Sequence, residues 1–262
     1  MTATSQGQAG GDTGPSVGPE YDDPDPGPTW RNVSSRELVS TLSLVLVRHG
    51  VTDATVAHML SGGSVTGPGL NAAGRVQAAK AADAVYRVGR DTWAPLKPVS
   101  RILASPMQRT QDTAAALGRR LGLHVEVDER AREVDFGEWE GLTAPQAFAA
   151  SGELFHRWDD AVERAPGGES LGDVVARMGG FVADLAQEQA RLCATDDVPR
   201  TIAIVSHSVA IRSIVAAAMG MPPASVARMW PVPASLTLLQ LRVTPEGGTH
   251  NNHLLALGVP TS

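Results

Sequence analysis

Four short groups of polar residues follow apolar segments, and together they hold the side chains that cleavage of a phosphate ester requires. They are Arg-His-Gly at 48–50, Ser-Pro-Met-Gln-Arg at 105–109, the segment 133–141 that begins with a glutamate, and Ser-His-Ser at 206–208. Guanidinium groups match the oxygens of a phosphate, and an imidazole can attack phosphorus as a nucleophile. Each group alone is a weak signal, because a histidine at a strand end is usually structural.

The charge of a phosphate monoester sets what each of these side chains has to do. We expect Arg48 and Arg109 to bind the phosphate oxygens, and His207 to add a third positive charge as an imidazolium. His49 has to be neutral on its attacking nitrogen, while a backbone acceptor holds the other nitrogen as N–H. Nearby cations disfavour protonation of His49. Attack on phosphorus by a neutral histidine gives a phosphohistidine, which water cleaves.

The same residues do not predict a metal or a cofactor. His49, His207 and Glu133 could suggest a zinc site, but Arg48 and Arg109 would repel the cation. The helical His-x-x-x-His spacing of zinc proteases is absent from the sequence.

A further segment matches the sequence pattern Gly-x-Ser-x-Gly of the nucleophile elbow in serine hydrolases. Residues 168–172 read Gly-Glu-Ser-Leu-Gly, but they follow the loop 165–167 instead of a strand. Ser170, with Asp173 three residues later, is better interpreted as the N-cap of a helix.

Short apolar runs alternate with helical patterns along the chain. The expected strands are residues 42–47, 102–104, 125–127, 201–205, 235–243 and 252–259. The expected helices follow Asn71, run from 107 to about 121, begin at Ser170 and run from 209 to 219, with irregular helix over 143–165. This alternation predicts an α/β fold, a three-layer α/β/α sandwich with a mostly parallel central sheet. Ligands bind at the carboxyl ends of such strands, where His49 and His207 would meet.

The amino-acid composition indicates how the chain divides into domains and which classes of partner are disfavoured. Residues 1–40 predict a disordered, acidic, Gly/Pro-rich tail, and residues 41–262 a single domain. No basic stripe indicates a nucleic-acid partner, and no run of 18 apolar residues indicates a membrane span. The sequence shows no secretory signal and one cysteine, Cys193, which favours a cytoplasmic setting and an inert, packed thiol.

Taken in order, the polar groups resemble the histidine phosphatase superfamily, which includes the cofactor-dependent phosphoglycerate mutases and many acid phosphatases. The resemblance covers about residues 42–258. Its motifs are Arg-His-Gly-x-Thr at 48–52, Ser-Pro-x-x-Arg at 105–109, Glu133 ahead of Gly-x-Trp-Glu-Gly at 137–141, Pro-Gly-Gly-Glu-Ser at 166–170, and His207 after a late strand. It implies a phosphoglycerate mutase-like fold, attack by Nε2 of His49, and Glu133 as the proton donor to the leaving alcohol and acceptor from water.

The resemblance also implies a set of substrate-binding residues. Thr55 stands where many members have asparagine, and Ser61 and Gly62 stand where relatives contact the phosphoryl or substrate group. Ser208 departs from the usual His-Gly-Gly, which narrows the expected pocket floor. Phe136 and Trp139 are candidates for an apolar wall of the pocket, together with Phe155 and Trp158, for which a place in the core is the favoured interpretation.

The implied function is an acid phosphatase-like phosphomonoester hydrolase that acts on a small phosphorylated metabolite. Members of the family are often dimers, so the resemblance also implies a homodimer. A phosphoglycerate mutase is the first alternative, but the segment 134–140 is acidic and aromatic where mutases are basic, and an acidic rim repels a polyanion. The second alternative is a pseudo-phosphatase that binds phosphate esters without turnover, and the residues at Thr55 and Ser208 keep it open.

Overall fold

The computed structural model describes residues 40–161, 163–194 and 198–261 of the chain. The predicted tail, residues 1–40, lies outside the described residues except for Ser40, which begins the first strand. The strands are β1 (Ser40–Arg48), β2 (Arg101–Ala104), β3 (Val125–Val127), β4 (Arg200–Ser206), β5 (Leu236–Val243) and β6 (His253–Val259). All six predicted strands are therefore present, with ends shifted by no more than two residues.

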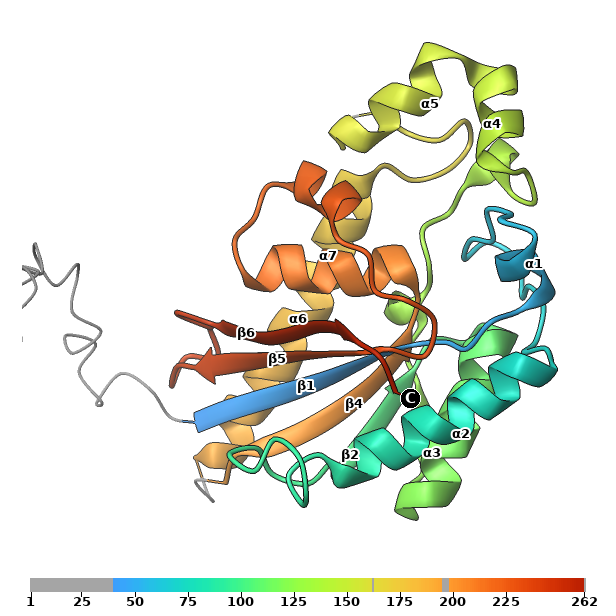
Figure 1. Cartoon of the computed structure of the whole chain (residues 1–262). Coiled ribbons are helices and arrows are strands. Elements are labelled where there is room, and N and C mark those ends of the chain that lie inside the picture. The colour runs from blue at the N-terminus through green and yellow to red at the C-terminus, as the bar shows by residue number, and fades with distance from the viewer. Residues whose placement is uncertain (1–39, 162, 195–197, 262) are drawn as a thin grey trace, which may run out of the picture. The chain divides into compact units, whose positions relative to one another are not determined.

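Helices separate the first five strands along the chain, whereas β6 follows β5 directly (Figure 1). The α-helices are α1 (Asp53–Val56), α2 (Ala72–Arg87), α3 (Gln108–Leu121), α4 (Ala144–Ser151), α5 (Glu153–Arg157), α6 (Leu171–Cys193) and α7 (Ser208–Ala218). Short 3-10 helices are η2 (Glu129–Ala131), η3 (Gly137–Trp139), η4 (Trp158–Asp160) and η5 (Pro223–Arg228).

The strands form one sheet in the order β3-β2-β4-β1-β5-β6. The pairs β3–β2, β2–β4 and β4–β1 are parallel, and β5 and β6 close one edge in antiparallel pairing. Parallel pairing aligns the carboxyl ends of neighbouring strands, so Arg48 lies opposite Ser206 and Ala104 opposite Val205. The sheet is therefore mixed and mostly parallel, as the sequence predicts.

Alternation along β1 builds the two cores that make the fold three-layered. Leu42, Leu44 and Leu46 point to the core beneath α6 and α7, whereas Val45 and Val47 point to the core beneath α2 and α3. A strand buried on both faces reads as a continuous apolar run, which explains its sequence. Figure 1 shows α6 and α7 on one face of the sheet and α2 and α3 on the other.

The predicted helix boundaries follow from their capping residues. Ser170 is the N-cap of α6, and a capping box with Asp173 is complete. Gly122 ends α3 in the left-handed conformation, with φ of 70°. The serine-hydrolase interpretation of Ser170 is thus excluded by its place at a helix start after a loop.

Two further expectations concern the membrane and the thiol. Within the part of the chain that the structure describes, no helix has the length and apolar character needed to cross a bilayer. Cys193 is buried at the end of α6, and Gln189 donates to its sulfur at 3.1 Å. This contact agrees with the packed thiol that the sequence predicts.

Candidate active site

The predicted catalytic residues converge at the carboxyl ends of three neighbouring strands. Arg48 and His49 end β1, Arg109 lies in the first turn of α3 after β2, and His207 joins β4 to α7. The ring centroids of His49 and His207 lie 5.2 Å apart in an edge-to-face arrangement. The parallel register of the strands makes this convergence, because it brings their ends together at one edge of the sheet.

The ring of His49 is oriented by the backbone. Its Nδ1 lies 2.7 Å from the carbonyl oxygen of Gly50, so Nδ1 carries the hydrogen and donates it. Gly50 is required here, because a Cβ at this position would lie 2.5 Å from the carbonyl oxygen of Gly74. This tautomer leaves Nε2 with a lone pair and without a hydrogen-bond partner among the described residues.

The surroundings of His49 keep it neutral. Burial lowers its pKa well below the ordinary value of 6.5, and the charges of Arg109 and Arg48 lower the pKa further. A neutral imidazole retains the lone pair that a nucleophile needs. The predicted protonation state of His49 therefore follows from the geometry.

Arg109 is almost completely buried and is held on two sides. Its Nη2 donates to the carbonyl oxygens of Ser61 and Gly62 at 3.1 and 2.9 Å, and its Nε donates to Nδ1 of His207 at 3.2 Å. Its Nη1 is buried without a partner among the described residues. A buried donor without an acceptor is costly, so Nη1 is poised for an anion.

Arg48 offers a second unpaired donor. Its Nη1 donates to the carbonyl oxygen of Pro231 at 2.8 Å, and its Nε is buried without a partner among the described residues. Burial lowers the pKa of Arg48 from its ordinary value, while the nearby carboxylate of Glu133 raises the pKa. The buried Arg109 and the partly buried Arg48 thus each place a buried, unpaired N–H donor near His49.

His207 differs from its sequence-based expectation. Its Nδ1 accepts the hydrogen of Arg109 Nε, so the neutral ring donates from Nε2 to Ser105 Oγ at 2.8 Å. Burial lowers the pKa of His207 well below 6.5, and Arg109 lowers it further. The expectation of an imidazolium is wrong for the free enzyme, because that ring would be buried beside an arginine with no acceptor at Nδ1. The sequence predicts no role for Ser105, the first residue of the Ser-Pro-x-x-Arg motif. In the structure its hydroxyl accepts from Nε2 and so fixes the orientation of the His207 ring.

Glu133 lies against the N-terminus of α7. Its carboxylate oxygens accept from the backbone N–H groups of Val134, Val209 and Ala210 at 3.0 to 3.1 Å. The positive end of the helix dipole attracts a carboxylate to this position. Glu133 is thereby held next to His207, one residue before α7 begins.

Arg177 and Glu169 form an ion pair that holds the segment carrying Glu133 in place. Arg177 on α6 donates to the carbonyl oxygens of Arg130 and Arg132 at 2.5 and 3.1 Å. It also pairs with Glu169, whose carboxylate accepts the backbone N–H of Asp135 at 2.9 Å. This contact gives a structural reason for the glutamate in the Pro-Gly-Gly-Glu-Ser motif.

The predicted substrate-binding residues have mixed outcomes. Ser61 and Gly62 lie beside Arg109 and bind it through their carbonyl oxygens, and Gly62 N–H donates to Glu140 at 2.8 Å. The hydroxyl of Thr55 bonds to the backbone and hydroxyl of Thr52 in the capping box of α1. Ser208 is the first residue of α7, and its carbonyl oxygen accepts from Arg212 at 3.1 Å. Contact of Thr55 and Ser208 with a substrate stays a prediction.

The proposed aromatic wall is instead a packed cluster. Phe136 contacts Trp158 at 5.8 Å between centroids, and Trp139 contacts Phe155 at 5.2 Å and Trp158 at 6.3 Å. Trp139 is 1% exposed, and its indole N–H donates to Ser151. The expectation that Phe136 and Trp139 form an apolar wall of the substrate pocket is therefore wrong, because both side chains pack in the core. The expectation that Phe155 and Trp158 pack in the core agrees with these contacts.

Arg212 is a buried arginine near the site that sequence reasoning missed. It is nearly buried on α7 and donates to the carbonyl oxygens of Val226 and Met229 at 3.0 and 3.1 Å. Burial lowers its pKa, and the charges of Glu133 and Asp159 raise the pKa. The available signal is an arginine five residues after His207, within a helix whose other residues are serines and apolar residues.

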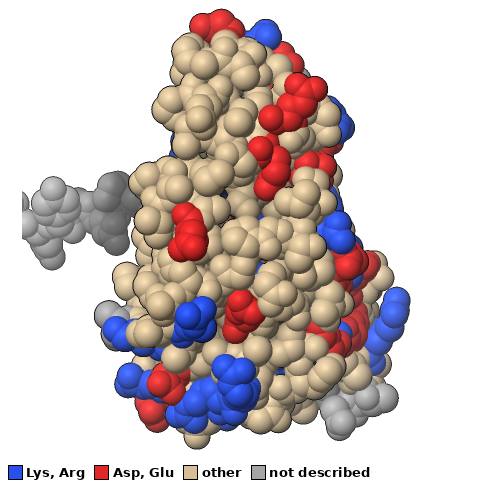
Figure 2. Space-filling view, turned by 90° about the vertical axis from the view of Figure 1, so that its right-hand side faces the viewer, with Lys and Arg blue, Asp and Glu red and all other residues tan. Residues whose placement is uncertain are grey.

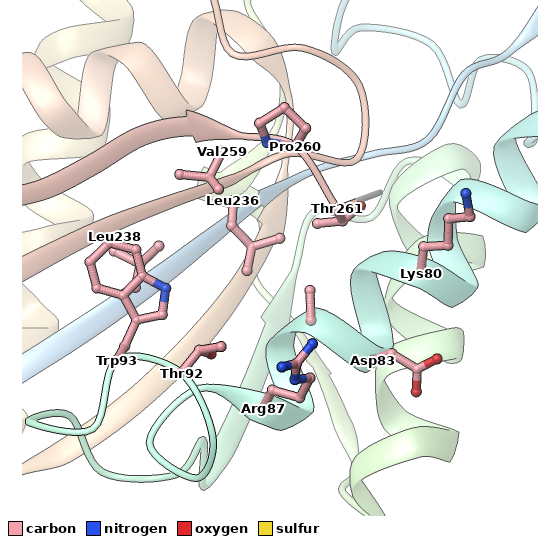
Figure 3. A pocket seen from close by; sticks show the side chains of 11 residues that line it. Lys80, Asp83, Arg87, Thr92, Trp93, Leu236, Leu238, Val259, Pro260 and Thr261 are labelled. Carbon is pink, nitrogen blue, oxygen red and sulfur yellow. The ribbon is translucent and has the colours of Figure 1, made fainter.

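A separate cavity of about 330 Å³ lies between α2 and the strands β5 and β6 (Figure 3). Lys80 and Arg87 line one side, Trp93 another, and Leu236 and Val259 come from the sheet. None of the predicted site residues lines this cavity. Among the described residues, no group of three or more His, Cys, Asp or Glu side chains could hold a metal ion.

The fold and the site define a class of protein. They combine a mostly parallel α/β sheet with a neutral histidine at its carboxyl edge, beside two arginines that each hold a buried, unpaired N–H donor. Residues 44–250 match the model of the histidine phosphatase superfamily, branch 1, and the chain belongs to this superfamily. It is a phosphomonoester hydrolase of that family, which confirms the resemblance seen in the sequence.

Relatives of known activity and structure agree with this assignment. The chain is 35% identical over 189 residues to glucosyl-3-phosphoglycerate phosphatase of Mycobacterium tuberculosis (strain ATCC 25618 / H37Rv), covering 72% of this chain and 78% of the relative. It is 28% identical over 181 residues to phosphoserine phosphatase 1 of Hydrogenobacter thermophilus, covering 68% and 77%. A solved mycobacterial glucosyl-3-phosphoglycerate phosphatase superposes with a TM-score of 0.71 at 31% identity, covering 84% of this chain and 99% of that structure.

Proposed function

We propose that the chain hydrolyses the phosphate monoester of a small metabolite through a phosphohistidine on His49. The observation that carries the proposal is the free Nε2 of a neutral His49, close to two arginines with unpaired buried donors, Arg48 Nε and Arg109 Nη1. These donors match the oxygens of the transferred phosphoryl group, where charge is spread in the transition state.

The proposed reaction has two steps. First, Nε2 of His49 forms a bond to phosphorus while the bond from phosphorus to the alcohol oxygen breaks, and Glu133, which must be protonated for this step, donates its proton to that oxygen. Then water attacks phosphorus, Glu133 takes a proton from the water, and the bond between nitrogen and phosphorus breaks. Inorganic phosphate leaves, and His49 is again neutral.

Arg109 is positioned for this reaction by its neighbours. His207 accepts from its Nε, and the carbonyl oxygens of Ser61 and Gly62 accept from its Nη2, so the guanidinium plane is fixed before substrate binds. Preorganised donors stabilise a transition state without reorganising during the reaction. We propose this positioning as the role of His207 in the free enzyme.

The alternative of a mutase is disfavoured by charge. Figure 2 shows acidic side chains over the upper part of one face, where α4 and α5 lie, while most basic ones lie lower. Asp135, Glu138 and Glu140 belong to the same segment that is basic in mutases. A substrate with two phosphate groups is disfavoured beside these carboxylates, whereas an ester with one phosphate and one carboxylate carries less negative charge.

The two relatives indicate which esters to assay first. Their names give glucosyl-3-phosphoglycerate and phosphoserine as substrates, and both are phosphate monoesters of small organic acids. We propose that this chain takes an ester of the same size class. A homodimer, a cytoplasmic setting and independence of metal stay predictions.

Release of inorganic phosphate by the purified full chain tests the proposal. Glucosyl-3-phosphoglycerate, phosphoserine and a chromogenic aryl phosphate are assayed with and without a chelator. We expect turnover that the chelator does not change, loss of that turnover in His49→Ala, and unchanged turnover in His124→Ala, an exposed histidine. Acid-labile, alkali-stable label on His49 after a quench with ³²P-labelled ester identifies the intermediate. Turnover by His49→Ala at the wild-type rate would contradict the proposal.

A further inference from the structure

Trp230 is an unusually exposed aromatic side chain. Its exposed fraction is 74%, whereas Trp93 is 36% exposed and Trp139 1%. Tryptophan is on average highly buried, because exposing its large apolar surface to water costs free energy. Trp230 follows η5, outside the two apolar cores that fold the domain.

The backbone around Trp230 is nevertheless fixed, and it is fixed by arginines of the active site. The carbonyl oxygen of Met229, before it, accepts from Arg212 at 3.1 Å. The carbonyl oxygen of Pro231, after it, accepts from Arg48 at 2.8 Å. Ala234 N–H then donates to the carbonyl oxygen of His49 at 3.2 Å. The segment 229–234 therefore runs along the carboxyl end of β1, and Trp230 stands between the two arginine contacts.

Polar groups lie beside the ring. The guanidinium carbon of Arg212 is 5.8 Å from the centroid of Trp230, and its Nη2 has no hydrogen-bond partner among the described residues. Asp159, an exposed carboxylate on η4, lies close enough for its charge to raise the pKa of Arg212. A flat apolar face beside a guanidinium with an unused donor suits a sugar ring, because C–H groups pack on the indole and hydroxyls need polar partners, and Asp159 adds a carboxylate near that guanidinium.

We propose that Trp230, with Arg212 and Asp159, forms a subsite for a sugar ring in the alcohol part of the phosphate ester. The proposal rests on the phosphatase function proposed above and names its substrate class, a phosphate monoester that carries a glycosyl group. The sugar stacks on Trp230 while the phosphate occupies the pocket of Arg48 and Arg109. The pinned backbone holds the indole in place before binding, which lowers the entropic cost of recognition.

A matched pair of substrates measures how much the sugar contributes to recognition. Glucosyl-3-phosphoglycerate and 3-phosphoglycerate differ only in the glucosyl group, so kcat/KM of each variant is compared on both. We expect Trp230→Ala to lower kcat/KM for the glucosyl ester about tenfold, mainly through KM, with less than a twofold change for 3-phosphoglycerate. Trp230→Phe retains an aromatic face and is expected to recover most of the loss. Asp159→Ala is expected to lower the same preference for the glucosyl ester.

Controls separate this inference from its alternatives. Trp93→Ala removes a partly exposed tryptophan from the cavity in Figure 3 and is expected to change neither substrate. An aryl phosphate shows whether any flat ring suffices, since equal losses for aryl and glucosyl esters would overturn the assignment to a sugar. A tenfold loss on 3-phosphoglycerate, or no loss on either ester, would also overturn it.

Three more outcomes would each reject the subsite. Dissociation of an oligomer by Trp230→Ala in analytical ultracentrifugation, without a change in the substrate ratio, would assign the indole to contact with a second copy. Turnover of 3-phosphoglycerate that depends on His49, with the substrate ratio unchanged in Trp230→Ala, would leave the proposed function intact. Absence of phosphate release from every ester would reject the proposed function as well.

Discussion

Nε of Arg109 donates a hydrogen bond to Nδ1 of His207 at 3.2 Å, and both side chains are buried. Because an arginine is always protonated, the acceptor nitrogen of His207 has to be unprotonated. The contact therefore sets the tautomer of one histidine and the orientation of one arginine together. His49 is held neutral in the same pocket by burial and by two arginines, so the free enzyme carries two buried, uncharged imidazoles.

These two histidines predict an acid-side loss of stability. Their pKa values are lowered in the folded state, whereas the unfolded chain has the ordinary value of about 6.5. The unfolded state binds more protons below pH 6.5, so stability is fully present above that pH and is lost as the pH falls below it. The loss is expected to approach roughly 1 kcal/mol per pH unit for each histidine.

Urea unfolding at pH 7.5, 6.5 and 5.5 measures this dependence. The double variant His49→Gln and His207→Gln is the control, because its two amides do not titrate. We expect a shallower pH dependence for the variant than for the wild type between pH 6.5 and 5.5. Equal slopes for the two proteins would show that these imidazoles are not held neutral.

Replacement of Arg109 by lysine is predicted to be severe although the charge is kept. A lysine ammonium cannot reach His207, the carbonyl oxygens of Ser61 and Gly62, and a phosphate at the same time. Loss of one preorganised donor costs about 10²- to 10³-fold in kcat, and we expect a decrease in that range for Arg109→Lys. Steady-state kinetics on an aryl phosphate measure it. Arg119→Lys, an exposed change on the same helix, is the matched control, and equal activity of the two variants would contradict the assigned role.

Ser170 is predicted to matter for stability and not for catalysis. Its hydroxyl accepts from Asp173 N–H at 3.1 Å and donates to the carboxylate of Asp173 at 2.7 Å at the start of α6. Loss of such a cap costs about 1 kcal/mol, so Ser170→Ala should unfold at lower urea concentration with kcat/KM unchanged. Loss of activity in a variant that is still folded would revive the serine-nucleophile interpretation.

Local patterns in the sequence predict the fold well, because most of its elements carry their own signals. β1 reads as a strand because it is apolar on both faces, and Gly122 and Ser170 mark helix ends by backbone and capping chemistry. The convergence of His49 and His207 is predictable as well, because parallel strands bring their carboxyl ends to one edge of the sheet.

Contacts between distant segments account for what the sequence could not predict. Whether Phe136 and Trp139 line a pocket or fill a core depends on Phe155 and Trp158, which only the fold brings to them. The charge of His207 depends on an arginine 98 positions earlier in the chain. No local pattern shows that the backbone beside Trp230 lies against an arginine of the site, so this segment carries no signal in the sequence.

Gly67 is predicted to control activity through its contact with Arg109. It has a φ of 69°, and a Cβ at this position would lie 2.5 Å from Nη1, the buried unpaired donor of Arg109. Gly67→Ala therefore strains the backbone by about 1 kcal/mol and also pushes the guanidinium from its place. Because small displacements of a binding group are costly in catalysis, we expect kcat/KM to fall about 10- to 100-fold.

Gly122→Ala separates backbone strain from the effect on the site. Gly122 has a φ of 70°, and a Cβ there would meet nothing within 4 Å. Both variants should thus lose similar stability in urea unfolding, and Gly67→Ala alone should lose activity on an aryl phosphate. If both variants kept full kcat/KM, the loop at Gly67 would not determine the position of Arg109, and its contacts with His207, Ser61 and Gly62 alone would hold the guanidinium.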